Sequence, residues 1–440
     1  MSASSAARQR PVLGLWPATA LVIGHTIAVG IFLTPAELIG ALGSPALTIG
    51  LWVGCGVLVL AGALTFGELA SRYPMAGGLY VYLREAWGER VAFLYGWQSM
   101  LVMDPGVTAA LATGMSGYLV LLWPALAGGE RWLAIATIWT LALLSMAGLR
   151  LSTRAIGLLT GAKLLAFAAV VVLAFAAGDG SWSNFQAPAA PGSGGMPRSE
   201  AIALALVAIF FSFGGFWEAS RVAGEVRDAP RAMPIALAAG VTCVTLVYVA
   251  TTVAFIYLVP VAQTTTAPEF ARLAGEAILG PAGPPVLAAI VVLSVAGSAL
   301  ALLIMAPRLY VAMSRDRLFP ARLARLNPAT GSPVRATVVL ALLASAFVFA
   351  GTFQQIVAFF MCTTLVFIAL AAAALVPLRR RGPVAPFSSP GYPVTPALFV
   401  ALVGVVVVLA AVNQPLQAGA GAAIVLLGLP AHRLLARAAT

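Results

Sequence analysis

The chain has 440 residues, of which 61% are hydrophobic and 9% are charged, and its mean hydropathy is +1.00. Because ordinary soluble domains carry about 25% charged residues, this composition excludes a soluble globular protein and indicates an all-α polytopic membrane protein. At about 20 residues per membrane helix, the length allows roughly twelve spans. The apolar runs are too long for an outer-membrane barrel, whose strands of about 10 residues alternate in polarity.

The net charge of +11 is distributed as expected for membrane topology rather than for nucleic-acid binding. Most of the 25 basic residues fall in alternate loops, including residues 315–335 and 379–381. This positive-inside pattern predicts that both termini are cytoplasmic. Cys55, Cys243 and Cys362 lie within apolar runs and lack metal-ligand spacing, so we predict no disulfide, metal site or cofactor.

The first apolar run, residues 13–39, contains the unusual stretch GHTIAVGIF at 24–32. Glycines, a histidine and β-branched residues stand where a membrane helix normally carries leucines, which predicts a break in the helix. Unwound backbone at membrane depth is tolerated only where it is buried or lines a cavity, because its N–H and C=O groups need partners. A bound substrate can be such a partner.

Further spans are expected in chain order at 47–70, 91–123, 132–149, 155–177, 201–224, 235–259, 286–312, 334–350, 356–375, 395–412 and 416–429. Residues 71–90, with Tyr80, Tyr82 and Trp87, suit a cytoplasmic interfacial helix. The predicted organisation is a cytoplasmic N-terminus (1–12), a first five-helix repeat (13–177), an external loop (178–200), a second five-helix repeat (201–377), two accessory spans (394–430) and a cytoplasmic C-terminus (431–440).

The span that opens the second half contains FSFGGF at residues 211–216, which predicts a second break in the position corresponding to the first. Since five is odd, the second repeat starts from the opposite side of the membrane, giving an inverted repeat. Paired broken helices are the best sequence indication of the central site of a transporter. Nothing resembles a nucleotide-binding loop, an HExxH motif or a nucleophile elbow, so no enzyme is predicted.

The two breaks suit the two ends of an α-amino acid. If the first span unwinds near Ala28, the next half-helix begins with unpaired N–H groups and a positive dipole end, which favour a carboxylate. Carbonyls freed near Phe211 and Gly214 would favour an ammonium group. The alternative is that these glycines only permit close helix packing.

Three ionisable residues within the predicted spans are candidates for a function. Lys163, the only lysine, is deep in its span, where a cation needs a partner or a function; it could instead pair with a buried carboxylate such as Asp104. Asp104, followed by Pro105, could hold a cationic substrate group, exchange a proton or pair with Lys163. His25, at the edge of the first break, could titrate near neutral pH or simply pack.

Two other polar pairs suggest ordinary structural roles. Glu218 and Arg221, three residues apart near the cytoplasmic end of their span, are expected to form an ion pair. Ser294 and Ser298 share a helix face that could approach Lys163, although serines in membrane helices usually bond a neighbouring helix.

GHTIAVGIFLTP (24–35), LTFGELASRYPMAGGLYVYLREAWGERVAFLYGWQS (64–99), FSFGGF and GEVRDAPRAMP (224–234) resemble the amino acid/polyamine/organocation (APC) superfamily. The similarity is closest to the L-type amino acid transporter branch and its bacterial relatives. It implies a leucine-transporter-like 5+5 inverted repeat with discontinuous helices 1 and 6. The implied substrate-binding residues are Ala28, Val29, Gly30 and Ile31 for the carboxylate, and Phe211, Ser212, Phe213, Gly214 and Gly215 near the amine.

The resemblance also implies roles for single residues. Phe211 matches an aromatic gate above the substrate, and Lys163 stands where sodium-coupled relatives bind sodium, which implies sodium independence. Ala28 and Val29 replace the family's glycine and small polar residue, which removes a side-chain hydroxyl from the carboxylate site.

The sequence therefore predicts a sodium-independent secondary transporter of neutral L-amino acids in the cytoplasmic membrane, working by exchange or proton-linked uptake. A polyamine or amine carrier with Asp104 as the cation anchor is the alternative, and a channel or transport-like receptor is a remote one. Mammalian L-type transporters join a glycoprotein through a cysteine between spans 3 and 4. The corresponding loop here, 124–131, contains none, so no disulfide-linked heavy subunit is expected.

Overall fold

A computed structural model describes residues 13–28, 30–176, 180–186, 197–259, 267–350, 353–382 and 384–439. These residues are predominantly helical, and an isolated bridge between Leu13 and Val226 is the β-pairing recorded among them. The first half contains α1 (Leu15–Thr26), α2 (Gly30–Leu42), α3 (Pro45–Arg72), α4 (Leu79–Trp87), α5 (Glu89–Gln98), α6 (Asp104–Leu122), α7 (Glu130–Met146) and α8 (Leu149–Ala176).

The second half is helical in the same way. It contains α9 (Arg198–Ser212), α10 (Ala229–Leu258), α11 (Ala267–Leu279), α12 (Gly283–Arg315), α13 (Val334–Ala350), α14 (Phe353–Ala373), α15 (Leu375–Arg381), α16 (Val394–Asn413) and α17 (Pro415–Ala439). Nine helical segments in the described part of the chain are long and apolar enough to cross a membrane, and α13 is a shorter apolar helix. The protein is therefore an all-α polytopic membrane protein.

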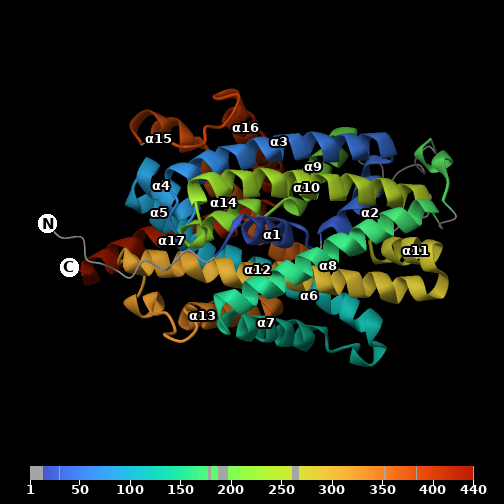
Figure 1. The fold of residues 1–440 in the computed structure, drawn as a ribbon, viewed down its shortest axis with the longest axis horizontal. Helices are drawn as coiled ribbons and strands as arrows, with labels where there is room; N and C mark the ends of the chain where they lie inside the picture. Colours follow the sequence, from blue (N-terminus) through green and yellow to red (C-terminus); the bar gives the residue numbers. More distant parts are fainter. Residues whose placement is uncertain are drawn as a thin grey trace.

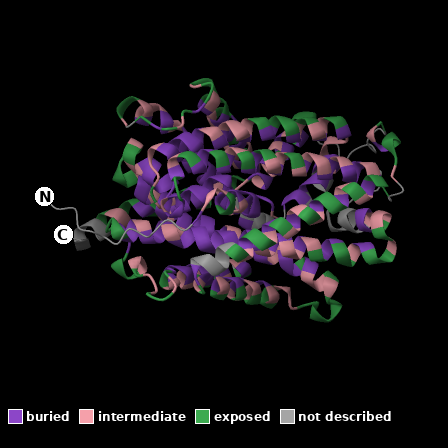
Figure 2. Cartoon of the chain, in the orientation of Figure 1, coloured by how far each residue is buried: buried purple, intermediate pink, exposed green. Residues whose placement is uncertain are grey.

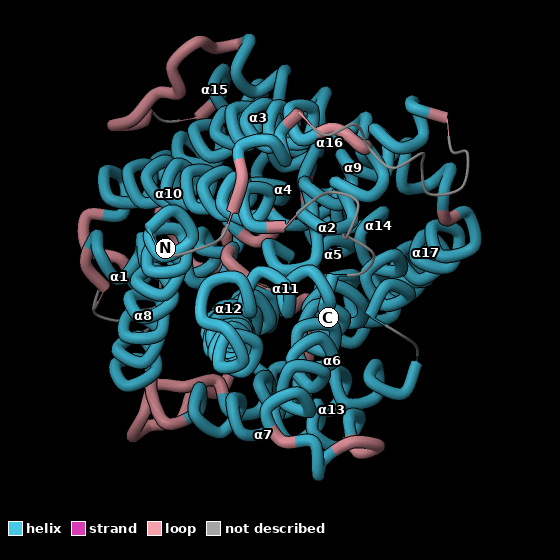
Figure 3. Tube along the Cα trace, turned by 90° about the vertical axis from the view of Figure 1, so that its right-hand side faces the viewer, coloured by secondary structure: helices cyan, strands magenta, loops and turns pink. Residues whose placement is uncertain are grey.

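The helices run roughly alongside one another in an elongated bundle (Figure 1). Helices α4, α5, α15 and α17 lie at one end, and α11 lies at the other. Seen end-on, α3 and α16 lie toward one margin and α7 and α13 toward the opposite one (Figure 3). Buried residues concentrate in the middle of the bundle (Figure 2), where the short α1 packs against α8, α10 and α12.

The first predicted break is present. Helix α1 ends at Thr26, Ile27 has extended backbone with ψ of 91°, and α2 begins at Gly30; Val29 lies outside the described residues. A Cβ at Gly30 would lie 2.6 Å from Oγ of Ser212, the last residue of α9. The glycine therefore lets the two broken helices approach closely.

The second break follows α9. Gly215 has φ of +104°, and a 3₁₀ segment covers Phe216–Glu225 before α10 begins. A positive φ is a conformation that glycine adopts without steric cost, so the predicted break at residues 211–216 occurs at its glycine pair. The far ends of the two broken helices also meet: Leu13 N–H donates to the Glu225 carbonyl (3.0 Å), and Arg227 N–H donates to the Leu13 carbonyl (2.7 Å).

Substitution of Gly215 by alanine is expected to destabilise the protein by about 1–3 kcal/mol, the usual cost of a strained backbone position. A Cβ there would overlap the imidazole ring of His25, so the change should also impair transport. Gly54→Ala in α3 is the matched control, because its Cβ would have no neighbour within 4 Å. Thermal unfolding in detergent and uptake assays would measure both; equal behaviour of the two variants would contradict the prediction.

A third irregularity lies in the predicted span 91–123. A π-helical turn at Ser99–Met103 separates α5 from α6, and the N–H of Asp104 donates to the carbonyl of Ser99. Pro105 supplies a reason, because proline removes one helix hydrogen bond and disturbs the preceding turn.

The prediction that residues 71–90 form an interfacial helix is only partly right. Helix α4 is present, but Tyr80 and Tyr82 are buried inside the protein, and only Trp87 is exposed. The hydrophobic face of α4 packs on the 3₁₀ segment, α5 and α14, so it covers the protein core instead of resting on lipid.

Candidate functional site

A small cavity of about 60 Å³ lies between the two breaks. Seven residues predicted from the sequence line it: His25, Ala28, Gly30, Phe211, Ser212, Gly214 and Gly215. The remaining wall is mainly apolar and comes from the π-helical turn, α6, α12 and α14, with Met103, Val107, Leu111, Leu302, Phe360, Met361 and Leu365. Thr26, Thr364, Phe210 and Trp217 complete it.

Two predicted residues lie away from this cavity. Ile31 is fully buried, but it is not part of the cavity wall. Phe213 packs against Trp52 and Tyr248, with ring centroids 5.8 and 5.4 Å apart. The turn at the end of α9 thus directs the Phe213 side chain toward α3 and α10 and away from the cavity.

Polar contacts hold the two breaks together. The Thr34 and Ser212 hydroxyls lie 2.8 Å apart. The Tyr248 hydroxyl, from α10, lies within hydrogen-bond distance of the Thr26 carbonyl (2.9 Å) and the Ser212 carbonyl (2.8 Å). These carbonyls end α1 and α9, where the helices leave acceptors without partners. Tyr248 was not predicted, although a tyrosine in the middle of an apolar span needs a hydrogen-bond partner.

Lys163 is fully buried in α8, and its ammonium group binds the end of α1. Nζ donates to the carbonyls of Gly24 (3.0 Å), Ile27 (2.7 Å) and Ser294 (2.8 Å), and to Oγ of Ser298 (3.2 Å). The first two are carbonyls that α1 frees by ending at Thr26. The alternative pairing of Lys163 with Asp104 is not present among its contacts.

Asp104 instead binds Arg221. Its two carboxylate oxygens lie 2.9 and 3.0 Å from Nη1 of Arg221, and Tyr310 donates its hydroxyl at 2.9 Å. All three side chains are fully buried. Asp104 is not among the residues that line the cavity, so the hypothesis that it anchors a cationic substrate has no geometric support.

The predicted ion pair of Glu218 with Arg221 is present, with Oε2 and Nε 2.5 Å apart. Both side chains are fully buried inside the protein. Arg221 also donates to the Tyr95 hydroxyl at 3.0 Å. The buried cluster is thus formed by Glu218, Arg221, Asp104, Tyr95 and Tyr310, from four helical segments.

His25 lines the cavity and contacts α12. Its Nδ1 lies 3.1 Å from the carbonyl of Ser298, and its ring lies against Gly215. The imidazole therefore fills the corner where α1 meets the second break.

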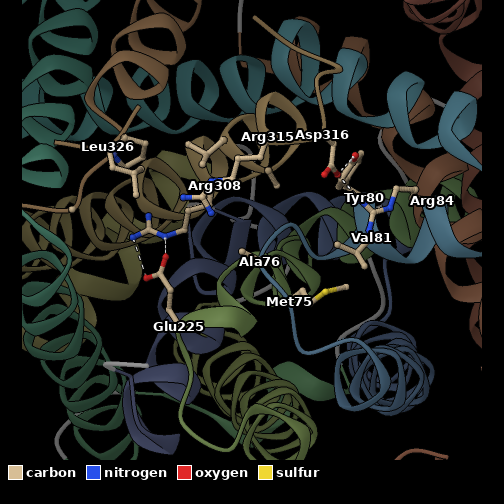
Figure 4. A pocket seen from close by; sticks show the side chains of 14 residues that line it. Met75, Ala76, Tyr80, Val81, Arg84, Glu225, Arg308, Arg315, Asp316 and Leu326 are labelled. Carbon is tan, nitrogen blue, oxygen red and sulfur yellow. Dashed lines mark hydrogen bonds and ion pairs between the residues drawn. The ribbon is translucent and has the colours of Figure 1, made fainter. Parts of the chain in front are cut away.

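A second cavity, of about 250 Å³, lies between α4, the 3₁₀ segment and α12 (Figure 4). Two ion pairs cross it: Glu225 with Arg308 at 2.6 Å, and Asp316 with Arg84. Tyr80 donates to Asp316 at 2.6 Å, and burial together with this hydrogen bond raises the pKa of Tyr80. The side chains in this cavity belong to the arginine-rich end of the bundle, so we call it the basic vestibule.

The sequence was compared with known proteins. A model of the amino acid permease family matches residues 13–429. The cystine/glutamate transporter of Homo sapiens is 28% identical over 423 residues, covering 94% of this chain and 83% of that protein. The serine/threonine exchanger SteT of Bacillus subtilis is 25% identical over 436 residues, covering 96% and 95%.

The large neutral amino acids transporter small subunit 2 of Mus musculus is 26% identical over 440 residues, covering 96% of this chain and 80% of that protein. The family model spans nearly the whole chain, and two broken helices face one central cavity, as predicted. The chain therefore belongs to the amino acid permease family of the APC superfamily of membrane transporters.

Proposed function

We propose that this protein is a sodium-independent secondary transporter that carries neutral L-amino acids across the cytoplasmic membrane by alternating access. The proposal is based on the cavity between the breaks. Residues at the ends of both broken helices line one part of this cavity, and mainly apolar side chains line the rest. The relatives named as exchangers or amino acid transporters support the same class of substrate.

The two ends of the substrate would bind backbone groups. The start of α2 at Gly30 offers N–H groups at the positive end of a helix dipole, which favour a carboxylate. The end of α9 at Phe211 and Ser212 offers carbonyl oxygens, each with two acceptor sites, to an ammonium group. In this pose Phe211 would close over the substrate.

The wall of the cavity favours a neutral substrate side chain. None of the described residues that line it is an aspartate, glutamate, lysine or arginine, and most are aliphatic or aromatic. A charged substrate side chain would lose its hydration without gaining an ion pair. The same argument weighs against the polyamine alternative, since Asp104 is bound to Arg221 and Tyr310.

Sodium independence rests on Lys163. Its ammonium group already binds three backbone carbonyls and one hydroxyl near the first break, which are the hard oxygen ligands that a sodium ion would need. A fixed cation in this position stabilises the end of α1 without an ion from solution.

Topology and partners follow from the sequence. We place both termini in the cytoplasm, together with the basic vestibule, because most arginines lie at that end. We expect no disulfide-linked subunit, because the loop at residues 124–131 contains no cysteine.

The test is uptake into proteoliposomes that contain the purified protein, in sodium-free buffer, using a panel of radiolabelled amino acids. We expect saturable uptake of neutral L-amino acids that depends on internal unlabelled amino acid or on an inward proton gradient. Competition by free amines but not by amino acids would instead establish an amine carrier. Binding without any flux would indicate a receptor, and uptake that does not saturate would indicate a channel.

A further inference from the structure

The buried cluster around Arg221 holds more negative than positive charge. The carboxyl groups of Asp104 and Glu218 both contact the same guanidinium group, at 2.9 Å and 2.5 Å. All three side chains have no exposed surface. If both carboxyl groups were ionised, the cluster would carry one uncompensated negative charge in the middle of a membrane protein, which is strongly unfavourable. When two carboxylates share one buried cation, one of them takes up a proton.

Hydrogen bonding indicates which carboxyl group takes up that proton. Both oxygens of Asp104 accept from Arg221, and one also accepts from Tyr310, so this carboxylate is well stabilised. Glu218 has one close contact, to Nε of Arg221, and neither of its oxygens makes a hydrogen bond of ordinary geometry. A proton on Glu218 removes the excess charge at the smallest cost in hydrogen bonds.

Among the described residues around Glu218, no second cationic side chain contacts its carboxyl group. The titratable groups that face the cluster are Tyr95 of α5, Asp104 of α6, Tyr310 of α12, and His25 of α1 across Gly215. Several other charged groups on neighbouring segments form ion pairs of their own: Glu68 of α3 with Arg72 and Arg379, Arg84 of α4 with Asp316, Arg308 of α12 with Glu225, and Asp228 with Arg231 at the start of α10. Of the titratable groups that face the cluster, Tyr95 accepts from Arg221, and His25 contacts a backbone carbonyl through Nδ1.

Glu218 also belongs to the segment that shapes the substrate cavity. Its N–H donates to the carbonyl of Gly215 at 3.0 Å, and both Gly215 and Trp217 line the cavity. A change of charge at Glu218 alters its attraction to Arg221 and therefore the position of the 3₁₀ segment that follows the break. Substrate binding in the cavity and protonation of Glu218 would therefore both affect the backbone conformation of residues 215–218.

We propose that Glu218 binds one transported proton in each cycle, which makes amino acid uptake proton-linked. The proton comes from water on the external side, binds a Glu218 carboxyl oxygen while the substrate occupies the cavity, and leaves to cytoplasmic water after the inner side opens. This inference rests on the proposed function, because it concerns the coupling of that same transport.

The experiment uses the purified full-length protein in liposomes loaded with a pH-sensitive dye. Addition of an external neutral amino acid should acidify the interior of wild-type liposomes, and Glu218→Gln should reduce this acidification to the background of protein-free liposomes. Counterflow at equal pH on both sides should persist in Glu218→Gln at a reduced rate. Glu200→Gln is the matched control, since Glu200 is an exposed residue at the start of the same broken helix, and it should acidify like wild type.

Infrared spectroscopy supplies a readout that does not depend on transport. The wild-type protein should show the carbonyl stretch of a buried protonated carboxylic acid, and this band should be absent in Glu218→Gln and present in Glu200→Gln. If Glu218→Gln does not fold, wild-type counterflow without acidification, or a wild-type spectrum that lacks this band, would still overturn the proposal.

The possible failures are distinguishable. Wild-type counterflow without acidification, or acidification that persists in Glu218→Gln, would overturn the proton site and leave the transporter intact. A wild-type protein that catalyses no amino acid flux at all would overturn the proposed function, and the proton-linked mechanism with it.

Discussion

Substitution of Lys163 by alanine is expected to reduce amino acid transport to the background of protein-free liposomes. The change removes an ammonium group that binds the carbonyls of Gly24, Ile27 and Ser294. These buried carbonyls would lose their charged donor and keep only the hydroxyls of Ser294 and Ser298 as partners. That loss costs free energy, so the end of α1 should leave the geometry that forms the cavity. Uptake and size-exclusion profiles measured together would separate lost transport from a lost fold.

The control for this variant is Leu165→Ala, on the same helix but with a side chain that is 74% exposed on the outer surface. It should transport like wild type, because its side chain contributes little to the packed interior. Full transport by Lys163→Ala would show that the first break holds its shape without the ammonium group, and the proposed role of Lys163 would be abandoned.

The second large effect is expected at Arg221. Replacing it with methionine leaves the carboxylate of Asp104 buried without its cation, and breaking a buried ion pair typically costs about 3–5 kcal/mol. The double variant Asp104→Asn/Arg221→Met should recover part of this loss, because it removes the unpaired charge along with the cation. Thermal unfolding in detergent would measure both variants.

Arg198→Met provides the comparison for Arg221. Arg198 is exposed at the start of α9, on the same broken helix, so its loss should leave the unfolding midpoint nearly unchanged. If Arg221→Met unfolded at the same temperature as Arg198→Met, the cluster would not stabilise the fold.

Composition and glycine placement were sufficient to predict the fold class and both breaks. Gly30 and Gly215 lie where chain direction changes, and glycine is the residue that permits such backbone. The carbonyl ligands of Lys163 were predictable as a class, because a cation so deep in a span needs oxygen partners. The resemblance to a known family added the roles expected of single residues at the two breaks.

The buried cluster was not predictable from spacing in the chain. Asp104 and Arg221 are distant in sequence, and only the packing of α6 against α12 and the 3₁₀ segment brings them together with Tyr310. One signal was available: Arg221 falls within the predicted span 201–224, where an ionisable residue already indicates a buried partner. Side-chain directions, such as that of Phe213, depend on the exact turn at the end of α9 and could not be read from the sequence.

The backbone contact between Leu13 and Glu225–Arg227 has a consequence for leakage. It ties the beginning of α1 to the end of the 3₁₀ segment by two main-chain hydrogen bonds, which only a substitution by proline would remove directly. We therefore expect α1 and the 3₁₀ segment to move together as one unit during transport and not independently of each other. Such coupled movement would disfavour conformations in which only one of the two segments has moved. Those partly open conformations are the ones that would allow uncoupled leakage of solutes across the membrane.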